Sequence, residues 1–131
     1  MTLPGTAQPV VFILTADRRK SMPFYVDVLG LPVLAEEDFG VVFDLGNGAT
    51  LRLTDVKDHV PSPHTVMGWE VPDIREAMAT LRGQDVEFLI YEGFGQDADG
   101  VWRFEGTQLA WFNDPDGNNL SLAQHGKAAT G

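Results

Sequence analysis

The fold of this chain is decided by two stretches that follow one pattern, NGATLRL at residues 47–53 and DGNNLSL at residues 116–122. A shift of 69 positions brings the glycine and both leucines of the first stretch onto those of the second. In each stretch a turn signal is followed by a strand whose apolar and polar residues alternate. The sequence therefore contains an internal repeat, and each copy of the repeat ends in this strand.

The residues that precede each stretch repeat as well. A short β-rich strand, at residues 10–15 in the first copy and 65–71 in the second, leads to an aspartate that can cap a helix, Asp17 or Asp73. An amphipathic helix that a glycine ends is expected after each aspartate. Pro23 is tolerated in the first of these helices if it lies in the first turn.

Three strands are expected after each helix. In the first copy they lie near residues 32–37, 40–45 and 49–54, and in the second near residues 86–92, 103–112 and 119–124. One copy alone would expose the apolar face of its sheet to water, so the two copies must pack together or exchange. The sequence thus predicts an α+β fold built from two βαβββ modules.

We expect residues 1–131 to form a single domain. Its first module spans residues 9–54 and its second module residues 64–124. Residues 55–63 are polar and carry two prolines, which is typical of a linker at the surface. Residues 125–131 are expected to form a frayed tail.

Composition limits the classes of partner. The formal net charge of −10 argues against binding to nucleic acid, because such a field repels phosphate backbones. The apolar run at residues 10–15 is too short to span a membrane. The chain has no cysteine, which excludes disulfides and thiolate metal sites, and we expect a cytoplasmic protein.

Three motifs carry a resemblance to a known family: D-x-x-x-S-x-x-F-Y-x-x-x-L-G-L from Asp17 to Leu31, W-E-V-P-D from Trp69 to Asp73, and F-N-D-P-D-G-N-N-L-S-L from Phe112 to Leu122. With these motifs the chain resembles the glyoxalase / bleomycin-resistance / extradiol-dioxygenase superfamily, also called the vicinal oxygen chelate superfamily. The resemblance implies that the sheets of the two modules curl into a cup-shaped mixed sheet, which holds the site. It also implies a homodimer.

The resemblance further implies where a metal would be held. Members with a metal place one ligand, usually His, on the first strand of each module and one, usually Glu, on the last strand. The matching positions here are Val10 and Val66 on the first strands and Arg52 and Ser121 on the last. Two valines, an arginine and a serine cannot hold a divalent cation, and the arginine would repel one. We therefore expect a branch of the family without the metal ligands and without a cofactor.

The candidates for ligand binding are Arg52, Glu70, His64, Phe12, Trp102 and Trp111. Arg52 either clamps an anionic group or forms a structural salt bridge with Glu70, which is otherwise a candidate base. His64, which a two-residue change of register would put in the place of Val66, is either a hydrogen-bonding or basic group or an exposed histidine at a strand edge. Phe12 shares the parity of Val10 and is expected on the cup floor. Trp102 and Trp111 are either stacking walls for a planar ligand or core residues.

Three functions follow from these residues. The first is a metal-independent small-molecule-binding protein of the glyoxalase/bleomycin-resistance type, which holds its ligand in the cup for resistance or sequestration. The alternative is a lyase, isomerase or dioxygenase-like enzyme of the glyoxalase family, for which the sequence assigns no catalytic residue. A structural or regulatory module is the third, and it predicts a cup filled by its own side chains. In each case residues 93–100, rich in glycine and aspartate, are expected to form a mobile lid.

Overall fold

The computed structural model describes residues 2–126 and divides the chain between Val60 and Pro61 into two compact units. The division lies inside the segment that the sequence predicts as a linker. We call the units the first and the second module and describe each by itself. Within residues 2–126, no helix has the length and apolar character needed to cross a membrane.

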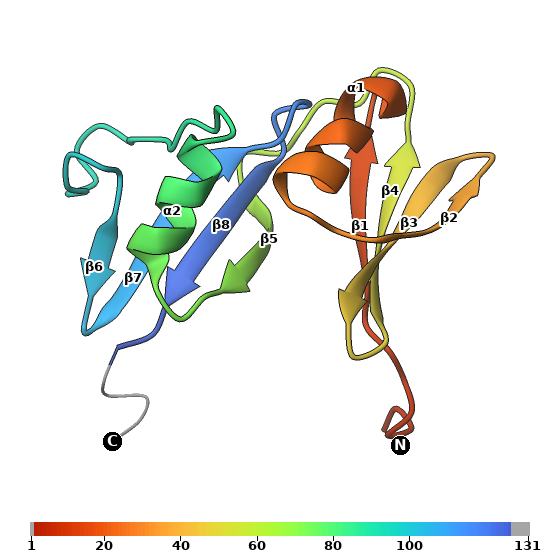
Figure 1. The fold of residues 1–131 in the computed structure, drawn as a ribbon, viewed down its shortest axis with the longest axis horizontal. Helices are drawn as coiled ribbons and strands as arrows, with labels where there is room; N and C mark the ends of the chain where they lie inside the picture. The colour runs from red at the N-terminus through yellow and green to blue at the C-terminus, as the bar shows by residue number, and fades with distance from the viewer. Residues whose placement is uncertain (1, 127–131) are drawn as a thin grey trace. The chain divides into compact units, whose positions relative to one another are not determined.

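The first module is a four-stranded mixed sheet with one helical segment against it (Figure 1). Its elements in chain order are β1 (Val10–Thr15), α1 (Arg18–Pro23), η1 (Phe24–Val28), β2 (Val33–Glu37), β3 (Gly40–Gly46) and β4 (Ala49–Asp55). The strand order is β1-β4-β3-β2, and only the β1–β4 pair is parallel. The order of elements is therefore βαβββ, as the sequence predicts.

The helical segment of the first module begins as expected and continues differently. Asp17 caps it, because its side chain accepts a hydrogen bond from the Arg19 amide at 3.1 Å. Pro23 is the last residue of α1 and does not lie in its first turn, and the next turn widens to the π-helix η1. Because proline has no amide hydrogen to donate, the regular α-helical bonding is interrupted there.

Apolar side chains fill the space between this segment and one face of the sheet. Tyr25 of η1 is fully buried, and its ring lies 5.8 Å from that of Phe43. The sheet contributes fully or almost fully buried residues from three strands, namely Ile13, Val41, Leu51 and Leu53. The opposite face of the sheet carries the residues of the other parity, which include Phe12 and Arg52.

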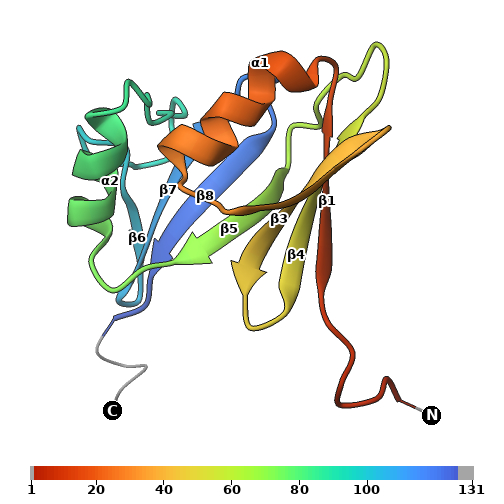
Figure 2. The ribbon, with the colours of Figure 1, turned by 45° about the vertical axis from the view of Figure 1, so that its right-hand side comes forward.

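The second module repeats this arrangement (Figures 1 and 2). Its elements are β5 (Thr65–Glu70), α2 (Ile74–Arg82), β6 (Trp102–Phe104), β7 (Thr107–Asn113) and β8 (Asn119–Gln124). The strand order is β5-β8-β7-β6. Asp73 caps α2 by accepting a hydrogen bond from the Glu76 amide at 3.1 Å. The buried side of α2 meets the sheet through Ile74, Met78 and Leu81, opposite Ala110, Phe112, Leu120 and Leu122.

The strands of the second module differ from the prediction at one place. Residues 86–92 form no strand, and only Phe88 makes a single bridge to Phe112. The segment predicted as one strand at residues 103–112 is instead the hairpin β6–β7, because Glu105 and Gly106 both have positive φ and turn the chain. The α+β fold of two βαβββ modules is confirmed, with β6 in the place of the predicted strand at residues 86–92.

Candidate functional site

The face of the second sheet that α2 does not cover is lined by two rows of residues. Directly paired residues of neighbouring strands lie on the same face. The pairing gives the rows Gly68–Ser121–Trp111 and Glu70–Ala123–Leu109–Trp102. A Cβ atom at Gly68 would collide with the hydroxyl of Ser121, so the place beside the glycine is taken by that hydroxyl.

Five aromatic side chains gather on this face, and we call them the aromatic cluster: Tyr91, Phe94, Trp102, Phe104 and Trp111. Trp102 and Phe104 are stacked, with ring centroids 5.8 Å apart and planes 5° from parallel. Phe94 lies between the tryptophans, 5.5 Å from Trp102 and 5.6 Å from Trp111. Tyr91 lies 5.7 Å from Trp111. Tyr91, Phe94 and Phe104 are 41%, 45% and 58% exposed, so the cluster presents ring surface to solvent.

Polar groups border the aromatic cluster. Asn119 of β8 donates a hydrogen bond to the hydroxyl of Tyr91 at 3.0 Å. Its amide oxygen accepts a hydrogen bond of 2.6 Å from Thr65 of β5. Apolar ring surface beside a few fixed polar groups is the usual composition of a small-molecule site.

The loop that carries Tyr91 and Phe94 is held by a glutamine. The side chain of Gln96 accepts a hydrogen bond from the Tyr91 amide at 2.6 Å. It donates to the carbonyl oxygens of Leu89 at 2.9 Å and Gly100 at 2.7 Å. One side chain therefore joins the two arms of the loop, which the sequence predicts as a mobile lid.

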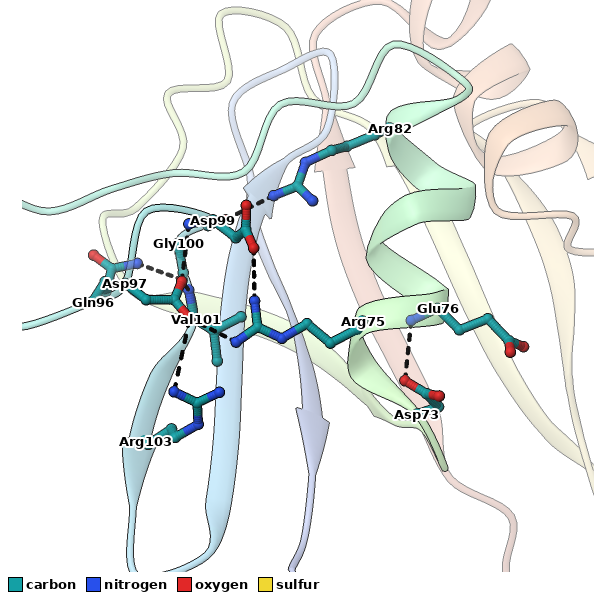
Figure 3. Close-up of polar contacts among 10 residues, drawn as sticks. All are labelled: Asp73, Arg75, Glu76, Arg82, Gln96, Asp97, Asp99, Gly100, Val101 and Arg103. Atoms are coloured by element: carbon teal, nitrogen blue, oxygen red, sulfur yellow. Dashed lines mark hydrogen bonds and ion pairs between the residues drawn. The ribbon is translucent and has the colours of Figure 1, made fainter.

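The next residue fastens the same loop to α2 (Figure 3). Asp97 forms an ion pair of 2.6 Å with Arg75, and Arg75 also contacts Asp99 at 2.8 Å. The other carboxylate oxygen of Asp97 accepts hydrogen bonds from the amides of Asp99 and Val101. The hydrogen bond from Arg75, with help from these two amides, lowers the pKa of Asp97 to about 2 against the opposing effect of burial.

The first module places two of the predicted residues side by side on its open face. Phe12 is 62% exposed, as expected for a residue that is not in the core. It is the direct neighbour of Arg52 in the parallel β1–β4 pair. Arg52 forms an ion pair of 2.7 Å with Glu37, and both side chains are 40% exposed.

The structure gives Arg52 and Glu70 each a partner within its own module. Arg52 contacts Glu37 of its own sheet, two strands away, and Glu70 lies 2.7 Å from Nε2 of His125. The alternation of side chains along the strand suggested Glu70 as the partner of Arg52. Glu37 could be recognised as a partner only once the strand order of the first module was known. His64 is exposed directly before β5.

A cavity of about 440 Å³ lies beside the start of α1 in the first module, lined by Ala16, Asp17, Arg18, Arg19, Asp55 and Lys57. Its main polar group is already satisfied, because Arg18 donates to Asp55 at 2.6 and 2.9 Å and to the carbonyl oxygen of Asp38 at 2.8 Å. This arrangement joins α1 to the end of β4, and we assign it a structural role.

Comparison with known proteins decides the family. The model of the Glyoxalase/Bleomycin resistance protein/Dioxygenase superfamily matches residues 7–122. The chain belongs to this superfamily. No curated protein matches the chain.

Solved structures of superfamily proteins share the fold at low sequence identity. A putative glyoxalase family protein from Bacillus anthracis has a TM-score of 0.73 and 15% identity, over 95% of this chain and 99% of that chain. TnmS3, an antibiotic binding protein from Streptomyces sp. CB03234, has a TM-score of 0.70 and 22% identity, with the same coverage. Lactoylglutathione lyase from Agrobacterium tumefaciens has a TM-score of 0.69 and 18% identity, over 92% of this chain and 95% of that chain.

The residues at the superfamily's ligand positions do not fit a divalent metal. Val10 is 45% exposed and offers only an alkyl group, as does Val66. Arg52 is a cation that already holds Glu37, and Ser121 is a neutral hydroxyl beside Gly68. Within residues 2–126, no group of three or more His, Asp or Glu side chains is placed to hold a metal ion.

Sequence reasoning found Trp102 and Trp111 but missed the other members of the aromatic cluster. Phe104 lies two residues after Trp102 on the short strand β6, so both side chains point to the same face. A correct assignment of this strand from the sequence would have indicated Phe104 as well. Tyr91 lies in the segment misassigned as a strand and Phe94 in the loop predicted as a lid, so no periodicity pointed to them. Asn119 was visible only as part of the family motif.

Proposed function

We propose that this superfamily member binds a planar aromatic small molecule on the aromatic cluster of its second module, without a metal and without chemistry. The observation that carries the proposal is the exposure of this cluster on a sheet face, beside Asn119. Exposed contiguous ring surface on a domain of this size indicates a binding site. Resistance to a toxic compound, or its sequestration, is the role that such binding supports.

Two further observations support this reading. Each well-placed aromatic pair contributes about 0.5–1.5 kcal/mol beyond the burial of area, so several rings together can hold a flat ligand. TnmS3, a structural neighbour, is described as an antibiotic binding protein. The net charge of −10 also favours cationic over anionic ligands at long range.

The remaining candidate contacts are divided between the two modules. In the first module Phe12 offers exposed ring surface, and Arg52 beside it can hold an anionic group if that group displaces Glu37. We propose Phe12 and Arg52 as ligand contacts on the open face of the first module, and Glu70 and His64 as further contacts on the second module. Substitution in one module at a time separates their contributions.

The proposal is tested by a fluorescence titration with a panel of planar aromatic compounds, in the presence of EDTA. At least one compound should quench tryptophan emission and bind the wild type. Trp111→Ala should weaken that binding by about 1–3 kcal/mol, the range for stacking of a flat ring on an aromatic side chain. Trp69→Phe is the matched control, because Trp69 pairs with buried Leu122 and has the parity of the covered face.

Failure takes a specific form in this titration. If every bound compound keeps its affinity in Trp111→Ala and Trp102→Ala, the aromatic cluster is not the site. If binding disappears when EDTA is added to the wild type, the site needs a metal, and the metal-independent function is wrong.

An enzyme of the lyase or isomerase kind is the second candidate, and one contact favours it. Glu70 and His125 lie 2.7 Å apart, on the second module and near its open face. A carboxylate that holds an imidazole can take up and return a proton. Turnover of a carbonyl substrate that Glu70→Gln abolishes would favour this candidate over pure binding.

A further inference from the structure

Two of the five rings in the aromatic cluster are carried by a loop and not by the sheet. Trp102, Phe104 and Trp111 belong to β6 and β7, whose backbone hydrogen bonds fix them. Tyr91 and Phe94 lie between α2 and β6 in a segment that includes Gly93 and Gly95, both with positive φ. The position of these two rings therefore depends on what holds the segment.

Besides the backbone hydrogen bond from the Leu89 amide to the Trp111 carbonyl oxygen, the side chains of two neighbouring residues hold the segment. Gln96 binds the Tyr91 amide and two carbonyl oxygens, and so fixes the arm that carries the rings. Asp97 is the following residue, and its carboxylate forms an ion pair with Arg75 of α2. Since α2 covers the other face of the sheet, Arg75 holds the loop from the side away from the aromatic cluster.

Arg75 is well suited to this task. Its two terminal nitrogens contact two different carboxylates of the loop, Asp97 and Asp99, at 2.6 and 2.8 Å (Figure 3). Such forked contacts restrict geometry more than a single point charge does. Arg82, two turns further along α2, adds a hydrogen bond of 2.7 Å to the carbonyl oxygen of Asp99.

We propose that Arg75 is a positioning residue for ligand binding, which sets the affinity of the aromatic cluster without touching the ligand. It acts through Asp97 and Gln96 on the placement of Tyr91 and Phe94. The proposal rests on the proposed function, because it takes the aromatic cluster as the site. It adds a determinant of affinity on α2, outside the aromatic cluster.

The chain offers a matched control for Arg75. Arg103 of β6 also approaches Asp97, but at 3.8 Å and with 59% of its side chain exposed. Arg103→Gln removes the same charge near the same carboxylate and breaks no close hydrogen bond of the loop. A difference in affinity between Arg75→Gln and Arg103→Gln therefore reports the loss of the close ion pair with Asp97 and not the loss of a positive charge.

The test measures the dissociation constant of proflavine, a planar aromatic cation, in the full chain. Arg75→Gln should weaken binding by about three- to tenfold, the size of effect for residues that act on a site from outside it. Arg103→Gln should change it less than about twofold, and Arg75→Lys should recover part of the loss. In a Tyr91→Ala/Phe94→Ala background, Arg75→Gln should have almost no further effect, because the rings it positions are gone.

A second measurement needs no ligand. The Tyr91 amide, bonded to Gln96, should exchange its hydrogen faster in Arg75→Gln than in the wild type, while amides in the middle of β7 keep their rates. Faster exchange throughout the second module would show general destabilisation and would contradict a positioning role.

The outcomes separate the two proposals. If proflavine binds the wild type, Trp111→Ala weakens it, and Arg75→Gln leaves it unchanged, the role of Arg75 is overturned and the aromatic cluster stands as the site. An equal loss from Arg75→Gln with and without Tyr91 and Phe94 also overturns it. If Trp111→Ala has no effect on proflavine, the proposed function itself fails.

Discussion

Arg52 shows how much strand order matters to a single side chain. Its parity places it on the open face of the first sheet, as the family pattern predicts, and there it forms an ion pair with Glu37. The pair is half-exposed, and solvent screening limits the stabilisation that such a pair gives. Arg52 is therefore available to a ligand at small cost.

We expect Arg52→Ala to lower the free energy of unfolding by less than about 1 kcal/mol, the usual range for exposed ion pairs. Chemical denaturation of both proteins measures this difference. Glu37→Gln is the control and should have an equally small effect. A loss of several kcal/mol would show that Arg52 is a structural residue of the core.

Asp97 predicts a dependence on pH. Its pKa of about 2 in the folded chain lies below the ordinary value of 3.8, so the folded state is favoured whenever this carboxylate is ionised. The stabilisation is fully present above about pH 4 and disappears as the pH falls through the folded value near 2.

Asp97→Asn should therefore lower the unfolding free energy at neutral pH by about 1 kcal/mol, after allowance for partial exposure. The difference from the wild type should shrink between pH 4 and pH 2. Denaturation curves across this range provide the measurement, with Asp99→Asn as the more exposed comparison. A difference that stays constant with pH would contradict the assigned ion pair.

At the scale of elements, both helix starts could be read from the sequence because a capping aspartate is a local signal. Asp73 accepts from the Glu76 amide, and Gln124 of β8 also accepts from the Ile74 amide at 2.8 Å. The second contact joins the helix to the sheet and could not be seen in sequence, since the two residues are far apart in the chain.

Asp73→Ala should lower the unfolding free energy by about 1 kcal/mol, the usual cost of losing an N-cap. Asp73→Ser should recover most of this loss because a serine hydroxyl can accept the same hydrogen bond. Thermal unfolding followed by circular dichroism measures both variants. Equal losses in both would indicate that the carboxylate acts by its charge.

The segment from residue 86 to residue 101 is where sequence reasoning failed. Its first part, VEFLIYE, is rich in β-forming residues and was assigned as a strand, but it meets β7 only through the bridge at Phe88 and the hydrogen bond of the Leu89 amide to Trp111. Local propensity could not reveal that Gln96 and Asp97 draw the chain into a loop. The sequence therefore named the two tryptophans of the aromatic cluster and missed its other three rings, Tyr91, Phe94 and Phe104.

At the scale of the molecule, the repeat of βαβββ units could be predicted because each copy has its own turn, cap and terminal strand. The superfamily follows from the same motifs and is confirmed. What the repeat does not encode is the ligand, because side chains on an open sheet face are free to differ while the buried face keeps the fold.

We expect a homodimer, because each module exposes apolar residues on its open face that an assembly can cover. Light scattering at micromolar concentration should give a mass twice that of one chain. Dilution into the nanomolar range serves as the control and should reduce the mass if the association is reversible. A monomer at micromolar concentration would contradict this expectation.

The central claim is that the aromatic cluster of the second module binds a planar aromatic ligand, and the three tryptophan indole N–H resonances test it most directly. With proflavine titrated into 15N-labelled protein in EDTA, Trp102 and Trp111 should shift strongly because of the ligand's ring current. Trp69, with the parity of the covered face, should remain in place. Shifts at Trp69 alone, or none at Trp102 and Trp111 while proflavine is bound, would contradict the account.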